Sequence, residues 1–386
     1  MPTKKMNEFR MHQRIVQLTL LVLYFLLSYN GVQGEKKLFK LKDVELEKQL
    51  KLLNKQAIKT IKTKNGDIYD CIDFYKQHAF DHPLLKDHNF HPKMKPTLSR
   101  MKQNSDASTT SRSSTMRLKN GGCPSGTVPI KRTTKDDLIR QRSMPPPENV
   151  NFDAQFVGVD PTLYGDNQTR LFIHIQAGKI HCFNTLCPGF IIVNTEIPLG
   201  MSYEDNISER GGTTWEDTMY IQRVLLYLFL LCKIFIMFIQ IYELQFERNV
   251  NTDIDILFFK TKDVVGNWWL LIGENYEQIG FWPPRIFTDL ASFATNVEWG
   301  GVVYSPPGVP APPMGSSFFP SENSAYDAYC RSIAIIDEIG WTVYLHRVII
   351  HVDNHFMYKV LFERLSSDSK SFAFVLYGGP GESAPV

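Results

Sequence analysis

The sequence lacks a strong net charge. Its 386 residues include 42 Lys and Arg against 40 Asp and Glu, which gives a formal net charge of +2. A chain this close to neutral sets up no strong field toward nucleic acid or an anionic membrane. We therefore expect no nucleic-acid partner, and a membrane partner only if a segment of the chain crosses the bilayer.

The sequence also lacks the spacings that hold metals and phosphates. Four histidines lie close together but match no usual zinc-site pattern: His78, His82, His88 and His91. The Gly-rich turn at the end of Phe372 to Gly381 is followed by neither Lys-Ser/Thr nor a helix, both of which a phosphate loop requires. We therefore expect no metal and no cofactor, and a zinc site built from the histidines is the alternative.

Aromatic residues, proline and glycine are abundant instead. Aromatics make up 12% of the chain, with 22 prolines and 24 glycines, and this composition favours a mainly β, loop-rich protein. In Gly266 to Pro320, aromatic and β-branched residues alternate with Gly and Pro, which predicts short strands joined by tight turns. Four tryptophans here are candidates for the floor of a binding groove, with core packing as the alternative: Trp268, Trp269, Trp282 and Trp299.

The first 34 residues have the pattern of a secretory signal. A basic start is followed by an apolar run from Ile15 to Tyr29 and by small residues at Val32 and Gly34, which is typical of a signal peptide over 1–34. We expect a secreted, extracellular protein, with an uncleaved anchor as the alternative. Six cysteines and two glycosylation sequons, at Asn167 and Asn206, agree with an oxidising compartment.

The region after the signal is predicted to be helical and irregular. Apolar residues recur at three- and four-residue steps between Lys36 and Lys62, which predicts an amphipathic helix carrying Leu46, Leu50, Leu53, Ala57 and Ile61. Met101 to Gly122 is rich in Ser and Thr and too poor in apolar residues to bury a core. We therefore expect a disordered linker at about 97–120.

A long apolar run, from Val224 to Leu244, interrupts the second half of the chain. It is long enough to cross a bilayer, although Lys233 would be costly near its centre. Three interpretations are open: a transmembrane anchor in a single-pass membrane protein, a buried helix or strand pair, and a translated intron or gene-model error in a decayed copy.

Several motifs resemble one family. Asp70 to Lys86 and Cys123 to Ile130 resemble the activation-peptide region of the neprosin family, secreted plant proteins whose founding member is a prolyl endopeptidase of the glutamic class. Four further blocks resemble its catalytic domain: Pro161 to Phe172, Cys182 to Phe190, Gly266 to Pro320 and Phe372 to Gly381.

The resemblance implies an antiparallel β-sandwich over 150–386 with an apolar insertion at 224–244, preceded by an activation-peptide-like pro-region over 35–134. The pro-region would block the active site until it is removed. The stretch from Ser143 to Val150 is too short for several strands of the family, so the sandwich is expected to be incomplete. The resemblance also implies two disulfides, Cys71–Cys123 and Cys182–Cys187, and leaves Cys232 and Cys330 unpaired.

The catalytic acids of the family are missing from this sequence. A glutamic peptidase needs two carboxyl groups that face one water, one as base and one as acid. The family's first glutamate falls at Ala154, or at Gln155 if one residue is gapped. Its second directly follows Trp-Gly-Gly, where this chain has Val302. The nearest acids that could replace them are Asp153 and Glu298.

Three functions are consistent with this sequence. The first is a secreted neprosin-like protein, a glutamic-class prolyl endopeptidase by resemblance, whose catalysis is impaired or absent. The second is a non-catalytic protein that binds Pro-rich peptides or cell-wall glycans, or else a membrane-anchored relative. The third is an active enzyme with relocated acids. A peptide, Pro-rich in the second case, is the expected substrate or ligand.

Overall fold

The structure of this chain is a computed structural model. It describes residues 43–96, 111–113, 116–143, 152–159, 161–177, 180–204, 206–217, 219–223, 266–273, 275–287, 294, 297–303, 305, 308–331, 333–336, 342–345, 348–367 and 370–382. The predicted signal peptide and the apolar run from Val224 to Leu244 lie outside these residues, as does Cys232. Among the helices of the described ranges, none is both long and apolar enough to cross a membrane.

The chain divides into two compact units. The first comprises Met1–Asn54 and Thr133–Ser143, and the second comprises Lys55–Arg132 and Met144–Val386. Most of the expected pro-region therefore belongs to the same unit as the expected β domain.

The first unit is helical where it is described. It contains a helix over 43–53 and α2 (Lys135–Ser143). Thr134 begins α2 with a reciprocal cap, because Asp137 N donates to Thr134 Oγ1 (3.2 Å) and Thr134 N donates to Asp137 Oδ2 (2.7 Å). Asn54 joins the two segments, since its side chain donates to Thr133 O (2.8 Å) and accepts from Thr133 N (2.9 Å).

The predicted amphipathic helix over 36–62 is wrong beyond residue 53. There the chain forms β1 (Ala57–Lys62), which pairs antiparallel with β2 (Ile68–Asp73), and β2 also pairs with β4 (Thr127–Lys131). Gly66, with φ +88°, adopts the left-handed conformation in the turn between β1 and β2. Residues four apart lie on the same face of a strand as well as on the same face of a helix. The turn at Gly66 favours the hairpin here.

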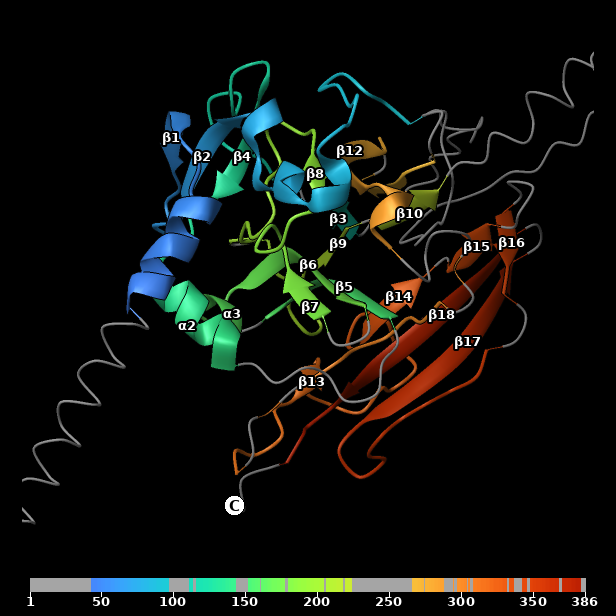
Figure 1. The fold of residues 1–386 in the computed structure, drawn as a ribbon. Coiled ribbons are helices and arrows are strands. Elements are labelled where there is room, and N and C mark those ends of the chain that lie inside the picture. The colour runs from blue at the N-terminus through green and yellow to red at the C-terminus, as the bar shows by residue number, and fades with distance from the viewer. Residues whose placement is uncertain are drawn as a thin grey trace, which may run out of the picture. The chain divides into compact units, whose positions relative to one another are not determined.

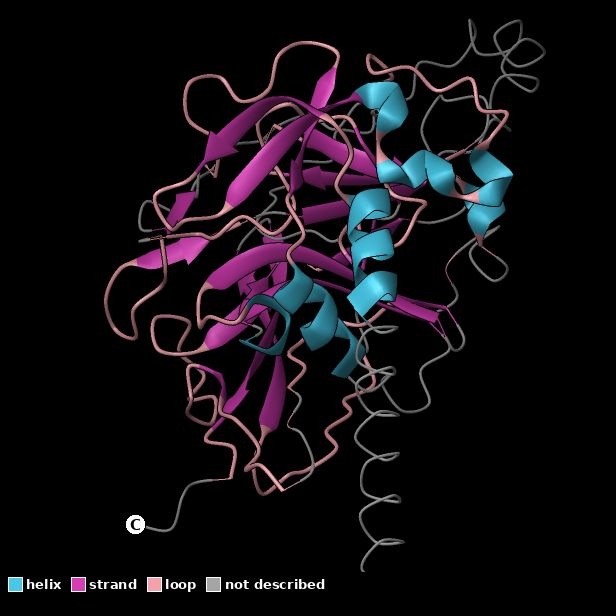
Figure 2. Cartoon of the chain, turned by 60° about the vertical axis from the view of Figure 1, so that its left-hand side comes forward, coloured by secondary structure: helices cyan, strands magenta, loops and turns pink. Residues whose placement is uncertain are grey.

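The second unit is mainly β, as predicted from the sequence, and the strands of its described part form several small sheets (Figures 1 and 2). All but one of the pairings in that part are antiparallel. Three sheets follow the hairpin β1–β2 and its neighbour β4: β5 (Phe152–Val159), β6 (Thr169–Ala177) and β7 (Ile180–Phe183); β10 (Met219–Arg223), β11 (Trp268–Ile272), β12 (Glu277–Trp282) and β8 (Ile191–Ile192); and β13 (Met314–Gly315), β18 (Lys370–Gly379), β14 (Ala328–Arg331) and β17 (Lys359–Ser367). A further pair joins β15 (Ala334–Ile336) to β16 (Thr342–Tyr344).

The predicted linker at about 97–120 is wrong for its last part. Residues 111–113 form β3 (Ser111–Ser113), which pairs in parallel with β9 (Thr214–Glu216). Met116 and Leu118 then enter the core, where 6% and 4% of their surfaces are exposed. Met116 and Leu118, two apolar residues at alternate positions, are the sequence signal for this burial. The Ser and Thr residues around them favour a linker instead.

A single hydrophobic cluster joins the pro-region to the β domain. Phe74 and Phe90 belong to the same buried cluster as Trp269 and Phe281. The rings of Phe90 and Phe281 meet edge to face, with centroids 5.1 Å apart. Burying a side chain of this size contributes roughly 1.5–3 kcal/mol, so residues 55–132 supply a substantial part of the core of this unit.

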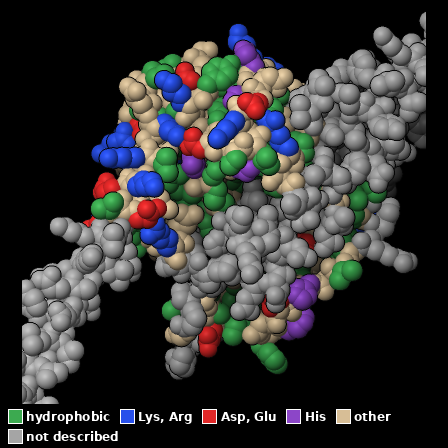
Figure 3. Space-filling view, viewed as in Figure 1, with side chains coloured by type: hydrophobic (Ala, Val, Ile, Leu, Met, Phe, Trp, Pro, Cys, Tyr) green, Lys and Arg blue, Asp and Glu red, His purple; other side chains and the backbone are tan. Residues whose placement is uncertain are grey.

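The surface agrees with the near-neutral net charge. On the face shown in Figure 3, Lys and Arg side chains are interspersed with Asp and Glu. Within the described part of that face, no single sign of charge predominates over a continuous area.

Candidate active site

Gln77 of the pro-region is held inside the β domain by its amide. Its side chain is 1% exposed. Gln77 Nε2 donates to Ile192 O (3.2 Å), and Ile192 N donates to Gln77 Oε1 (2.9 Å). The amide thus replaces a strand partner at the edge of β8, and it satisfies backbone groups that would otherwise be buried without a partner.

Backbone hydrogen bonds extend this attachment. Cys123 N donates to Thr195 O and Leu118 N donates to Glu196 O, each at 2.8 Å. Arg117 forms ion pairs with Glu196 and Glu277 from the β domain. These contacts fix the segment after β3 against the loop that follows β8.

A buried arginine connects carboxylates from both regions. Arg170, on β6, is 1% exposed. It donates to Asp166 Oδ2, Asp67 Oδ2 and Gly200 O, each at 2.6 Å, and its guanidinium lies 4.7 Å from the centre of the Tyr164 ring. Burial alone would raise the pKa of Asp166, but the hydrogen bond from Arg170 and the nearby positive charges outweigh it and lower that pKa.

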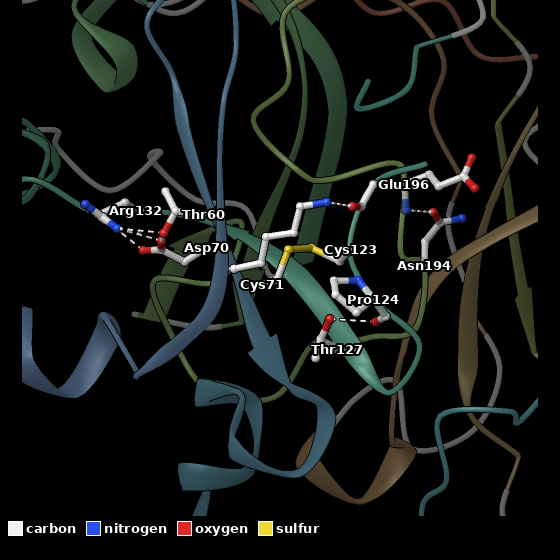
Figure 4. Close-up of a disulfide and its surroundings, with 11 residues drawn as sticks. Thr60, Asp70, Cys71, Cys123, Pro124, Thr127, Arg132, Asn194 and Glu196 are labelled. Atoms are coloured by element: carbon white, nitrogen blue, oxygen red, sulfur yellow. Dashed lines mark hydrogen bonds and ion pairs between the residues drawn. A yellow bond between two sulfur atoms is a disulfide. The ribbon is translucent and has the colours of Figure 1, made fainter. Parts of the chain in front are cut away.

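Both disulfides implied by the family resemblance are present. The Cα atoms are 5.5 Å apart in Cys71–Cys123 and 5.9 Å apart in Cys182–Cys187. Figure 4 shows the first bridge between β2 and the segment before β4, with Asp70 turned away from it toward Thr60 and Arg132. Cys330 is free, and burial raises the pKa of its thiol to about 12, so the thiol stays protonated.

The clustered histidines shape the backbone of the pro-region. The Nδ1 atoms of three of them each accept a hydrogen bond from the backbone N–H two residues later, at 3.1 to 3.2 Å: His82, His88 and His91. His78 instead contacts Asp81, at 2.6 Å. Groups of three or more His, Cys, Asp or Glu able to hold a metal were sought in the described ranges, and none occurs there.

Three of the four tryptophans proposed for a groove lie in the core. Trp268, Trp269 and Trp282 are exposed by 3%, 0% and 5%, so they line no open groove in the part of the chain that is described. Trp299 is half-buried and packs against a smaller cluster around Ile333. Core packing, the alternative interpretation, therefore describes the first three.

The first family position for a catalytic acid lies on β5. In the antiparallel pair with β6, Ala154 is opposite Ile175, and Asp153 is opposite Gln176. Successive residues of a strand belong to opposite faces of its sheet. Asp153 therefore occupies the other face from residue 154, and so does Gln155.

The second family position is at the surface. Val302 is 69% exposed, in the loop over 297–303 that also contains the exposed Glu298. The preceding glycine is required by packing, because a Cβ on Gly301 would lie 2.7 Å from Met314 Sδ and 2.8 Å from the Tyr377 ring. The turn is therefore held against β13 and β18, and it presents an apolar side chain to solvent.

A carboxylate that the sequence interpretation missed lies on β9. Glu216 accepts hydrogen bonds from Tyr329 Oη and from Arg331 of β14. Cys330, between these two on β14, points to the opposite face, where Gly300 donates to its sulfur. The pairs are separated by 113 and 115 residues, so no local pattern could have revealed them.

The two predicted sequons differ in their surroundings. Asn167 is exposed after α3 (Pro161–Tyr164), whereas Asn206 is half-buried. The hydroxyl of Ser208, part of the second sequon, bonds to the backbone of Trp215 on β9. Of these two asparagines, only Asn167 is exposed.

Comparison with protein families gives two matches. The family described as neprosin activation peptide matches residues 60–155. The family described as neprosin matches residues 147–224 and 236–380, more than half of the chain. The second match is interrupted within the apolar run that begins at Val224.

Proposed function

Because this chain belongs to the neprosin family, a family of prolyl endopeptidases, we propose that it is a secreted protein that binds extended Pro-containing peptides without hydrolysing them. The family implies a peptide as substrate or ligand. One observation carries the loss of hydrolysis: the exposed residue after Trp299-Gly300-Gly301 is Val302. A valine side chain neither accepts a proton from water nor donates one to a leaving amine.

The acids nearest to the two family positions do not replace the missing pair. Asp153 belongs to the opposite face of β5 from Ala154, and it is two residues along the strand from Gln155, the position that a one-residue gap gives. Glu298 is exposed and precedes the Trp-Gly-Gly turn, whereas the family's glutamate follows it. General acid–base catalysis depends first on reach to the reacting atoms, so we expect neither carboxyl to restore hydrolysis.

A peptidase assay tests the proposal directly. The recombinant protein is incubated at acidic pH with a fluorogenic Pro-containing peptide, before and after limited proteolysis of the pro-region. Because residues 55–132 supply part of the core, circular dichroism checks that the treated protein is still folded. We expect no cleavage in either state, and binding of the same labelled peptide measured by fluorescence anisotropy. Cleavage after proline would show that the chain is an active enzyme with relocated acids.

Restoring the acids provides the matching gain-of-function test. The double change Ala154→Glu and Val302→Glu is expected to produce cleavage after proline that the parent protein lacks. The control is Ala154→Gln with Val302→Gln, which matches the size and polarity but cannot transfer protons in the same way. Equal activity in the two double variants would show that the acids are not what is missing.

Secretion is tested separately. Expressed in plant cells, the chain is expected in the culture medium with a mature N-terminus at Glu35, following Gly34. Retention in the membrane fraction would favour an anchored protein instead.

A further inference from the structure

Strand β9 has one edge closed by its own chain. Trp215 N donates to Ser208 Oγ (2.8 Å), and Ser208 Oγ donates to Trp215 O (3.0 Å). One hydroxyl thus occupies both polar backbone groups of the central residue of β9. The turn between them is closed by Glu209 N, which donates to Thr213 O (2.9 Å).

The other edge of β9 is taken by β3. The N–H and C=O groups of successive residues in a strand point to alternate edges, so those of Thr214 and Glu216 face away from Ser208. Arg112 of β3 is in register with Trp215. The N–H and C=O of Trp215 already bond to Ser208. The register with Trp215 therefore directs the N–H and C=O of Arg112 toward Thr214 and Glu216. Within the described residues, β3 and β9 form a two-stranded sheet of their own.

The β domain holds β9 rigidly, independently of β3. Glu216 is bound by Tyr329 and Arg331 of β14. At the next residue, Asp217 Oδ2 accepts a hydrogen bond from Tyr203 Oη, 2.8 Å away. Ser208 thus holds the centre of β9, and these contacts hold its C-terminal end. A strand held in this way is a preformed edge, and pairing with a preformed edge costs less ordering entropy.

We propose that this edge of β9 is a docking site for an extended peptide that pairs with it in parallel, and that Ser111–Ser113 is its internal occupant. Peptide addition to an open strand edge gains affinity mainly from main-chain hydrogen bonds. The inference rests on the proposed function, because both take a Pro-containing peptide as the ligand.

The geometry determines which positions of such a peptide can be proline. The ligand residue that replaces Arg112 must keep its N–H, because its backbone faces Thr214 and Glu216. The residues on either side face away from β9 and need no N–H, so proline fits there and favours the extended backbone. The charge of Glu216 is already balanced by Arg331. The site therefore accepts a Pro-X-Pro segment, with X any residue other than proline.

The internal occupant must leave before a peptide can dock. It is attached on both sides, since Phe90 before it and Met116 after it belong to the core. A tethered segment competes at an effective concentration of roughly millimolar. The intact chain is therefore expected to bind a free peptide weakly, and a chain with a disabled β3 is expected to bind it more tightly.

The test uses the full chain with Arg112→Pro, and Arg112→Ala as the matched control. Both variants lose the same side chain, but only proline also removes the backbone N–H that faces β9. A fluorescein-labelled Gly-Pro-Ser-Pro-Gly peptide is the probe, and Gly-Ser-Pro-Ser-Gly, which places proline at the central position, is the control ligand. We expect Arg112→Pro to bind the probe at least about tenfold more tightly than Arg112→Ala, with no comparable gain for the control ligand.

Amide hydrogen exchange at Glu216, measured by NMR, locates the binding. We expect the Glu216 N–H to exchange faster in Arg112→Pro than in Arg112→Ala, and the probe to restore its protection. Binding of the probe without a change at Glu216 would overturn the docking site while leaving the proposed function intact. Failure of both variants to bind the probe would overturn the docking site and the peptide binding of the proposed function together.

Discussion

The pro-region and the Trp-Gly-Gly turn keep the family pattern in different ways. Residues 55–132 are attached to the β domain by Gln77, whose buried amide bonds to Ile192, and by Asp67, which pairs with Arg170. The Cys71–Cys123 bridge closes the region on itself. The turn retains its glycines but ends in Val302. The pro-region is tied to the fold by buried contacts, whereas position 302 faces solvent, where folding places little demand on the side chain. The residues that build this fold and those that would perform the reaction are therefore separable.

We expect the largest effect on stability from removing the Cys71–Cys123 disulfide of the pro-region. Cys71→Ser with Cys123→Ser opens a link between residues 52 positions apart, and Cys182→Ser with Cys187→Ser opens one between residues 5 apart. Loop-closure entropy predicts losses of roughly 4 and roughly 2 kcal/mol in the free energy of unfolding. Urea unfolding of both double variants measures the difference. Equal losses would show that the longer bridge constrains nothing beyond its local turn.

The buried arginine is the next test. Arg170→Met removes the ion-pair partner of Asp166 and one of the two partners of Asp67, and breaking a buried pair costs at least about 3 kcal/mol. Arg142→Met is the control, because Arg142 is exposed and bonds only Gln49 among the contacts described for it. It is expected to change the free energy of unfolding by less than about 0.5 kcal/mol. Thermal unfolding of the two variants gives both values, and a similar fall in Tm for both would contradict the role of Arg170.

Lowering the pH is expected to reduce the free energy of unfolding by a smaller amount, through two histidines of the pro-region. Burial, together with the charge of Arg285, lowers the pKa of His82 and of His88 from the ordinary value of 6.5. The unfolded chain then binds more protons than the folded chain, so stability is full above pH 6.5 and falls as the pH drops through the folded pKa values. Protonation also removes the Nδ1 acceptors that cap Leu84 and Phe90.

The matched variant replaces both rings by a cap that does not titrate. In His82→Asn with His88→Asn, the amide oxygen can accept the same backbone hydrogen bond. We expect the loss of Tm between pH 7 and pH 5 to be smaller in this variant than in the parent. An unchanged pH dependence would assign the loss to other groups.

The smallest effect is expected at position 302, beside a larger one at its neighbour. Gly301→Ala brings a Cβ within 2.8 Å of the Tyr377 ring, and overpacking of this kind costs roughly 1–3 kcal/mol. Val302→Glu changes an exposed side chain and should cost less than about 0.5 kcal/mol. Urea unfolding of these two single variants compares the cost in free energy of unfolding at a residue that packing constrains with the cost at its exposed neighbour. A destabilisation by Val302→Glu as large as that of Gly301→Ala would show that the fold also constrains position 302.

The sequence predicted the features that have local or family-wide patterns. The mainly β class followed from aromatic, Gly and Pro content, and the two cysteine pairings followed from motif resemblance. Assigning Ala57 and Ile61 to a helix failed because their spacing suits both helix and strand, although the turn at Gly66 favoured a hairpin. The contacts of Gln77 and of Glu216 could not be predicted, because each joins residues more than a hundred positions apart.

The tryptophans show a different limit. Their density predicted a layered core or a groove equally well, because both place flat aromatic surfaces together. Only the burial of Trp268, Trp269 and Trp282 separates the two interpretations. Composition reveals that large apolar surface is present, but not which side of it meets solvent.

The order of synthesis decides which ion-pair partner Asp67 can meet first. Lys131, one of its partners, follows it by 64 residues, and Arg170, the other, follows by 103. At roughly 5–20 residues per second, the ribosome delivers Arg170 roughly 5–20 s after Asp67. Lys131 therefore has the first opportunity to pair with Asp67, and the hairpin of β1 and β2 can assemble with β4 before β6 is complete. The segment made first can therefore form its own contacts before the rest of the unit is available to pack against it.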